Sequence, residues 1–174
     1  ILFVIISDLI SDLKKYSFHL AVFGVLASSL LVFMGGFSAD PKMLFNDLLI
    51  FDSFSYYFKC IILFSTLSII LVSRYSDELD DEYRAEYNTL LLVILLGMFL
   101  MTNSVNLIMI YLSLELVSIP SYVLAGILKN DKRSNEASLK YVIFGSFASG
   151  LMLFGFSLLY GVSGSLNIYE IHSM

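Results

Sequence analysis

One long, almost uncharged stretch constrains this chain more than any other feature. Between residues 87 and 128, a run of 42 residues, Glu115 is the only charged side chain. As a single helix this run would be about 63 Å long, roughly twice the hydrocarbon thickness of a bilayer. The chain must therefore turn inside it, and the polar residues 102–106 (TNSVN) are the natural turn. We expect two transmembrane helices, with Glu115 near the middle of the second.

The rest of the chain follows the same pattern of apolar runs. Of 174 residues, 58% are hydrophobic and 14% are charged, and the charges gather in short loops between apolar runs. Runs of about 20 apolar residues cross a bilayer as helices, and these are too long and too uniform for barrel strands. We predict an all-α fold, a polytopic transmembrane helix bundle forming a single domain over 1–174. The five expected spans are about 18–37, 53–73, 87–101, 105–128 and 138–160.

The loops can be sorted by side of the membrane. One side carries seven lysines and arginines, in the loops 7–17, 74–86 and 129–136. The other side carries only Lys42, in the loops 38–52, 102–104 and 161–174. By the positive-inside rule the first side faces the cytoplasm, or the matrix in a mitochondrion. Residues 1–6 are apolar but too few to span, so we interpret the sequence as a fragment.

Glu115 is the leading candidate for chemistry. An ionisable group at mid-membrane is costly and is a functional candidate by default. At helical spacing it shares one face with hydroxyl-bearing neighbours, and we expect this face to point toward protein. The stripe is Ile108, Tyr111, Glu115, Ser118 and Tyr122. Pro120 has no N–H and so frees the carbonyl of Leu116 beside the carboxylate. The residues favour a proton site, and a permanently paired structural acid remains the alternative.

Two lysines lie inside apolar runs. Lys140 is in the first turn of the last run, where it either faces inward or extends its ammonium to the basic side. Lys59 follows Tyr56 and Tyr57 at the start of the 53–73 run. Aromatic rings and an extended ammonium suit the headgroup region, so we expect Lys59 at the interface.

Several other classes of site find no support. Cys60 is the only cysteine, which excludes an intrachain disulfide, and isolated His19 and His172 assemble no metal site with it. The acidic loop 74–86 lacks the glycine and the final glutamate of a calcium loop, so we interpret it as solvated. There is no basic patch for nucleic acid, no phosphate-binding glycine loop and no nucleophile triad. We therefore expect no metal and no cofactor on this chain.

Two adjacent motifs carry a family resemblance. IYLSLELVSIPSYVLAG, followed by RSNEASLKYVIFGSFASGLMLFGFSLLYGVSG, resembles the antiporter-like membrane subunits of proton-pumping NADH:quinone oxidoreductase, respiratory complex I. The motif is most similar to that of the N-type subunit, called subunit 2 in mitochondria. FNDLLIFDSFSYYF and the segment leading into the first motif fit the same subunit, so the resemblance covers about residues 43–167.

The resemblance implies a fold of about fourteen transmembrane helices, of which this chain holds the second to the sixth. The family's glutamate of the fifth helix falls on Glu115, and its lysine of the sixth helix on Lys140. In the family that glutamate is paired with a lysine of the seventh helix, and further lysines follow in the eighth and twelfth, all beyond Met174. Quinone reduction elsewhere would disturb this pair and so move protons.

The same resemblance implies the surroundings of the chain. NADH, FMN, iron–sulfur clusters and quinone would belong to partner subunits. Neighbouring antiporter-like subunits and the lipid bilayer would be the partners of this one. The membrane would be the bacterial cytoplasmic membrane or the mitochondrial inner membrane. Three alternatives stay open: a subunit of a multisubunit cation/proton antiporter, a ferredoxin-dependent photosynthetic relative of complex I, and a structural membrane scaffold.

Overall fold

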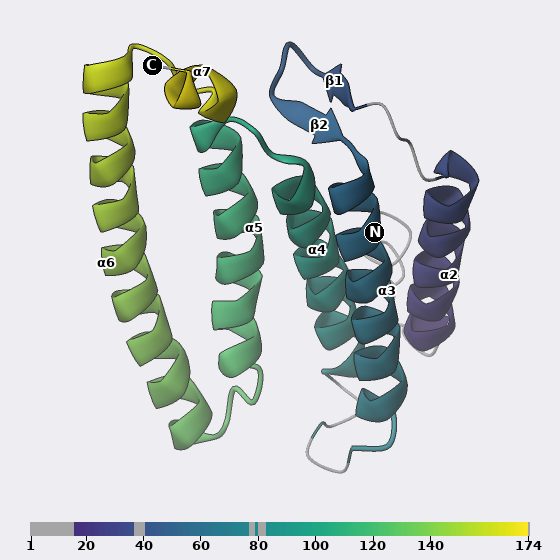
Figure 1. Cartoon of the computed structure of the whole chain (residues 1–174). Helices are drawn as coiled ribbons and strands as arrows, with labels where there is room; N and C mark the ends of the chain where they lie inside the picture. Colours follow the sequence, from purple (N-terminus) through teal and green to yellow (C-terminus); the bar gives the residue numbers. More distant parts are fainter. Residues whose placement is uncertain (1–15, 37–40, 77–78, 80–82, 174) are drawn as a thin grey trace.

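Five long helices run side by side in alternating directions (Figure 1). This computed structural model describes residues 16–36, 41–76, 79 and 83–173, so the predicted tail 1–6 and most of the loop 7–17 lie outside the described residues. The helices are α2 Ser17–Gly35, α3 Ser53–Ser73, α4 Arg84–Asn103, α5 Leu107–Ala125 and α6 Lys132–Ser163. Each is long and apolar enough to cross a membrane. The predicted helix bundle is confirmed, and the chain is an integral membrane protein.

Helix α6 begins six residues earlier than the predicted span. Asp131 caps it, accepting a hydrogen bond from the backbone N–H of Arg133 at 2.8 Å, as N-cap carboxylates do. Its 32 residues correspond to about 48 Å, well beyond the hydrocarbon thickness. The polar first turns of α6 therefore extend past the membrane on the basic side.

A small β-hairpin covers the opposite end of the bundle, together with the short helix α7 Ile168–His172 (Figure 1). Strands β1 Lys42–Leu44 and β2 Leu49–Phe51 pair antiparallel, with Lys42 opposite Phe51. The turn between them holds three residues with positive φ, Phe45 (55°), Asn46 (53°) and Asp47 (60°). Asn and Asp adopt this region readily, whereas for Phe it costs about 1–2 kcal/mol. We call this end of the molecule the hairpin end.

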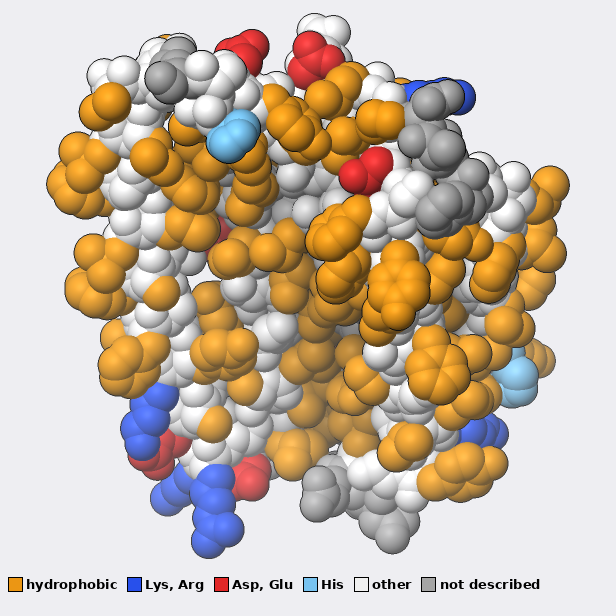
Figure 2. Space-filling view, viewed as in Figure 1, with side chains coloured by type: hydrophobic (Ala, Val, Ile, Leu, Met, Phe, Trp, Pro, Cys, Tyr) orange, Lys and Arg blue, Asp and Glu red, His pale blue; other side chains and the backbone are white. Residues whose placement is uncertain are grey.

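The main core lies between α2, α3 and α4. Its buried side chains come from all three helices and are Ala21, Val25, Leu63, Ile70, Leu91, Leu92 and Leu95. Helix α5 packs on α4, and α6 packs on α5. Apolar side chains also cover much of the visible outside of the bundle (Figure 2). On α6, for example, Phe144, Phe147 and Phe154 are exposed. Such a surface suits contact with lipid or with further helices.

The turn between α4 and α5 is held from two directions. The backbone N–H of Val105 donates to the carbonyl of Leu48 in the hairpin at 3.2 Å. The N–H of Leu107 donates to the carbonyl of Leu166 at 2.9 Å, and the N–H of Ile168 donates to the carbonyl of Val105 at 3.0 Å. The polar residues 102–106 therefore form the predicted turn, and this turn sets where α5 begins.

Candidate functional site

Glu115 lies near the middle of α5, which stands between α4 and α6 (Figure 1). It is the ninth of 19 residues, about 12 Å along the axis from the first. The side chain is half-buried and interacts electrostatically with the hydroxyl of Tyr111, one turn earlier. The carboxylate thus has a hydroxyl neighbour on its own face of the helix, as the helical spacing predicted.

The backbones of helices α4 and α5 approach each other closely beside Glu115. A Cβ on Gly97 would lie 2.8 Å from Val117 Cγ2 and 3.1 Å from the carbonyl carbon of Leu116. A side chain at position 97 would therefore push the two helices apart. Pro120 is buried inside α5, and its missing N–H removes the helical donor from the same Leu116 carbonyl. The backbone next to the carboxylate is thus both closely packed and short of one hydrogen bond within the helix.

Helix α6 closes the other flank of α5. The Ser138 hydroxyl donates to the carbonyl of Tyr122 at 2.8 Å, and the rings of Tyr122 and Tyr141 meet edge to face with centroids 4.7 Å apart. A Cβ on Gly145 would lie 1.9 Å from the Tyr122 hydroxyl oxygen. The predicted stripe thus faces protein at Tyr122, whereas Ile108 at its other end is 49% exposed.

Lys140 lies on the exposed face of α6. Its side chain is 64% exposed and forms an ion pair with Glu136, one turn earlier on the same helix. The neighbouring Ser138 contacts Tyr122, which is seven residues past Glu115, about 10 Å along α5. The described residues therefore do not bring Lys140 and Glu115 together.

Lys59 departs from the expectation of an interfacial lysine. It is only 6% exposed, and its ammonium lies 4.7 Å from the centroid of the Phe51 ring in β2. The buried residues of α3 are Ser55, Lys59, Leu63, Thr66 and Ile70. This spacing is helical, but the run is apolar on all its faces, so its periodicity alone does not single out the side that carries Lys59.

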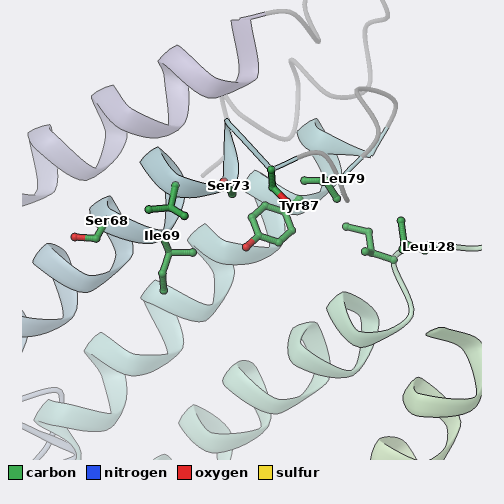
Figure 3. Close-up of a pocket in the computed structure, with 9 residues that line it drawn as sticks. Ser68, Ile69, Ser73, Leu79, Tyr87 and Leu128 are labelled. Carbon is green, nitrogen blue, oxygen red and sulfur yellow. The ribbon is translucent and has the colours of Figure 1, made fainter. Parts of the chain in front are cut away.

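A cavity lies at the basic end of the bundle, away from Glu115. It measures about 520 Å³ and lies where the end of α3, the start of α4 and the segment after α5 meet (Figure 3). Ile69, Val72 and Leu128 supply apolar walls, and Ser73 and Tyr87 supply hydroxyl groups. Among the described residues that line it there is no carboxylate, histidine or ammonium group.

Comparison with known proteins decides the family. Residues 104–174 match the family model described as NADH:quinone oxidoreductase/Mrp antiporter, TM. The NADH-quinone oxidoreductase subunit N of Anaeromyxobacter sp. is 44% identical over 132 residues, which are 76% of this chain and 26% of that protein. The chain belongs to this antiporter-like membrane-subunit family. It spans about a quarter to a third of the length of the curated relatives it matches.

Solved structures share the fold. Respiratory complex I from Thermus thermophilus contains a chain that superposes with a TM-score of 0.77 at 24% identity, covering 95% of this chain and 36% of that one. An archaeal membrane-bound sulfane sulfur reductase contains another, with a TM-score of 0.74 at 20% identity, covering 99% of this chain and 37% of that one. The family fold therefore extends beyond the residues matched by the family model.

Proposed function

We propose that this chain is part of a proton-translocating membrane subunit, of the N type, of an NADH:quinone oxidoreductase, and that Glu115 carries the proton. The observation that supports this most is a single carboxylate at the middle of α5, in a helix fitted against α4 through Gly97 and against α6 through Tyr122. A carboxylate placed there is costly unless it is paired or protonated. A group that can be either is suited to exchanging protons.

The chain's own residues define what Glu115 can do. Tyr111 interacts with the carboxylate, and the Leu116 carbonyl freed by Pro120 offers an acceptor for water beside it. A cation supplied by another part of the subunit would stabilise the ionised form, because an opposite charge a few ångströms away favours ionisation. When quinone reduction in partner subunits shifts that cation, Glu115 takes up a proton from one side and later releases it. Lys140 is the second proton-handling residue in this proposal.

The proposal places the chain in a larger assembly. Other membrane subunits of the complex, including neighbouring antiporter-like subunits, would be its partners, and NADH, FMN, iron–sulfur clusters and quinone would be bound by partner subunits. The chain would contribute to an enzyme, a translocase, without being catalytic on its own.

Replacing Glu115 by Gln in the complete subunit tests the proposal. Glutamine keeps the size and hydrogen-bonding capacity of the side chain but cannot ionise. We expect an assembled complex whose proton-to-electron ratio in liposomes falls at least twofold, with Glu115→Asp retaining most of it. Unchanged pumping by an assembled E115Q complex would contradict the proton-carrier role. Loss of assembly in E115Q would favour the scaffold alternative.

A second candidate function is supported by the family model, whose description also includes Mrp antiporters. In that case the subunit would exchange protons for another cation and would need no redox reaction. The two functions differ in their driving force. Liposomes holding the complete complex should acidify on quinone reduction if the first function is correct, and on an imposed cation gradient without any redox substrate if the second is.

A further inference from the structure

We propose that Lys59 is a further proton-exchanging group of this chain, placed at the hairpin end, where it passes protons between the bundle interior and the water on that side. The inference rests on the proposed function and extends it to a residue on a different helix. The features that carry it are the burial of Lys59, the lack of an ionic partner among the described residues, and an unpaired amide oxygen beneath the same hairpin.

The burial of Lys59 does not depend on segments beyond the described residues. It lies six residues after Ser53, the first residue of α3, about 9 Å along the helix. It sits one turn before Leu63 on the stripe that packs into the core of α2, α3 and α4. Further helices of the complete subunit could only cover more of its surface. The Lys59 side chain is therefore covered mostly by protein, at the hairpin end of the bundle.

The charges around Lys59 leave the ammonium weakly stabilised. Asp52 interacts with it electrostatically, but the Asp52 side chain is already engaged at the N-cap, where it accepts from the backbone N–H of Ser55 at 2.8 Å. No hydrogen bond or ion pair to Lys59 is formed within the described part of the chain. The Phe51 ring contributes a cation–π contact of about 0.5–2 kcal/mol. That is less than the several kcal/mol that burying an ion costs.

The other elements packed against α3 carry few described titratable groups, and these are exposed or near the far end of their helices. The titratable groups nearby are Asp52 at the N-cap of α3 and Tyr56, Tyr57 and Cys60 on the helix itself. Helix α2 carries only His19, and α4 only Arg84, Glu86 and Tyr87, all near the opposite end of their helices. In the hairpin, Lys42 and Asp47 are exposed. The side chain of a helical residue points toward the N-terminus of its helix, where the helix dipole also disfavours a cation.

An unpaired acceptor lies at the same end of the bundle. The amide oxygen of Asn103, the last residue of α4, is buried without a hydrogen-bond partner among the described residues. The next residue, Ser104, bridges to Leu49 of β2, the strand whose Phe51 lies beneath the Lys59 ammonium. Buried polar atoms of this kind are usually satisfied by ordered water. Water bound at Asn103 would lie at the same end of the bundle as Lys59.

The step itself is a simple proton exchange. The ammonium of Lys59 releases one proton to water beneath the hairpin and becomes a neutral amine, which burial tolerates better. The amine then takes one proton back from water on the interior side. No other bond is made or broken, and the net result is the transfer of one proton toward the hairpin side.

Two substitutions in the complete subunit, within the assembled complex in liposomes, test the inference. Lys59→Arg keeps a positive charge, but the guanidinium does not deprotonate in proteins. Lys59→Met removes the charge and keeps much of the length. We expect both variants to keep the rate of electron transfer measured in the presence of an uncoupler. We expect the proton-to-electron ratio of both to fall to half or less. The matched control is Lys42→Arg, at the exposed cross-strand neighbour of Phe51, which should pump as the unmodified complex does.

The outcomes separate this inference from the proposed function. If Lys59→Arg keeps the proton-to-electron ratio of the unmodified complex, only a fixed charge is needed at this position. If Lys59→Met keeps that ratio, the charge is dispensable. Either result overturns the inference. Failure of both variants to assemble would assign Lys59 a structural charge and would also overturn it. Glu115→Gln, measured in parallel, tests the proposed function: its loss of pumping beside a normal Lys59→Arg complex would refute the role of Lys59 alone.

Discussion

Replacing Gly97 by alanine should loosen the contact that holds α5 against α4 beside Glu115. The added Cβ would lie 2.8 Å from Val117 Cγ2 and 3.1 Å from both the carbonyl carbon of Leu116 and the backbone nitrogen of Val117. Two of these three atoms are backbone, so a rotamer change alone cannot remove the overlap. Overpacking of this kind costs about 1–3 kcal/mol. Alanine regains about 0.5–1 kcal/mol over glycine inside a helix, which leaves a net loss of about 0–2.5 kcal/mol.

The assay is unfolding of the complete subunit by SDS in mixed micelles, followed by far-ultraviolet circular dichroism. The matched control is Gly24→Ala in α2, where a Cβ meets nothing within 4 Å and points into space beside Leu92 and Leu96. The control should gain about 0.5–1 kcal/mol from helix propensity. If Gly97→Ala also stabilised the subunit by as much as the control does, the close approach of α4 and α5 would be refuted.

Two further substitutions test local interactions by the same unfolding assay. Asp52→Ala removes the capping box of α3, in which the Asp52 carboxylate accepts from the Ser55 N–H at 2.8 Å and the Ser55 hydroxyl oxygen accepts from the Asp52 N–H at 3.2 Å. We expect the free energy of unfolding to fall by about 1 kcal/mol. An unchanged free energy of unfolding would contradict the cap. Glu86→Gln breaks an exposed ion pair with Lys129 at 3.3 Å. We expect the free energy of unfolding to fall by less than about 1 kcal/mol, and by less still in high salt, because salt screens exposed charges.

The helices were predictable because lipid leaves few solutions. Backbone groups inside a bilayer must be hydrogen-bonded within the segment, so apolar runs of this length become helices. The length of the nearly uncharged run around Glu115 likewise required a turn, and the structure forms it at residues 102–106. The early start of α6 depended on a local cap at Asp131, which a prediction based on hydrophobicity does not weigh.

The hairpin and the burial of Lys59 depend on contacts distant in sequence. Strands of three residues carry too little alternation to be seen, and the hairpin is held partly by the bond from Val105 to Leu48. Lys59 is buried partly because this hairpin places Phe51 beneath the ammonium. The ion pair of Lys140 is local by contrast, because its partner Glu136 is one turn away on the same helix. A pair of this spacing can be predicted from the sequence.

The role of Glu115 can be observed directly by redox-induced infrared difference spectroscopy of the assembled complex. Reducing the quinone should produce a carboxyl band that reports a change in the protonation of Glu115, and this band should be missing in the Glu115→Gln complex. An identical difference spectrum with and without the substitution, from complexes that both reduce quinone, would show that Glu115 keeps one protonation state throughout and would contradict the account.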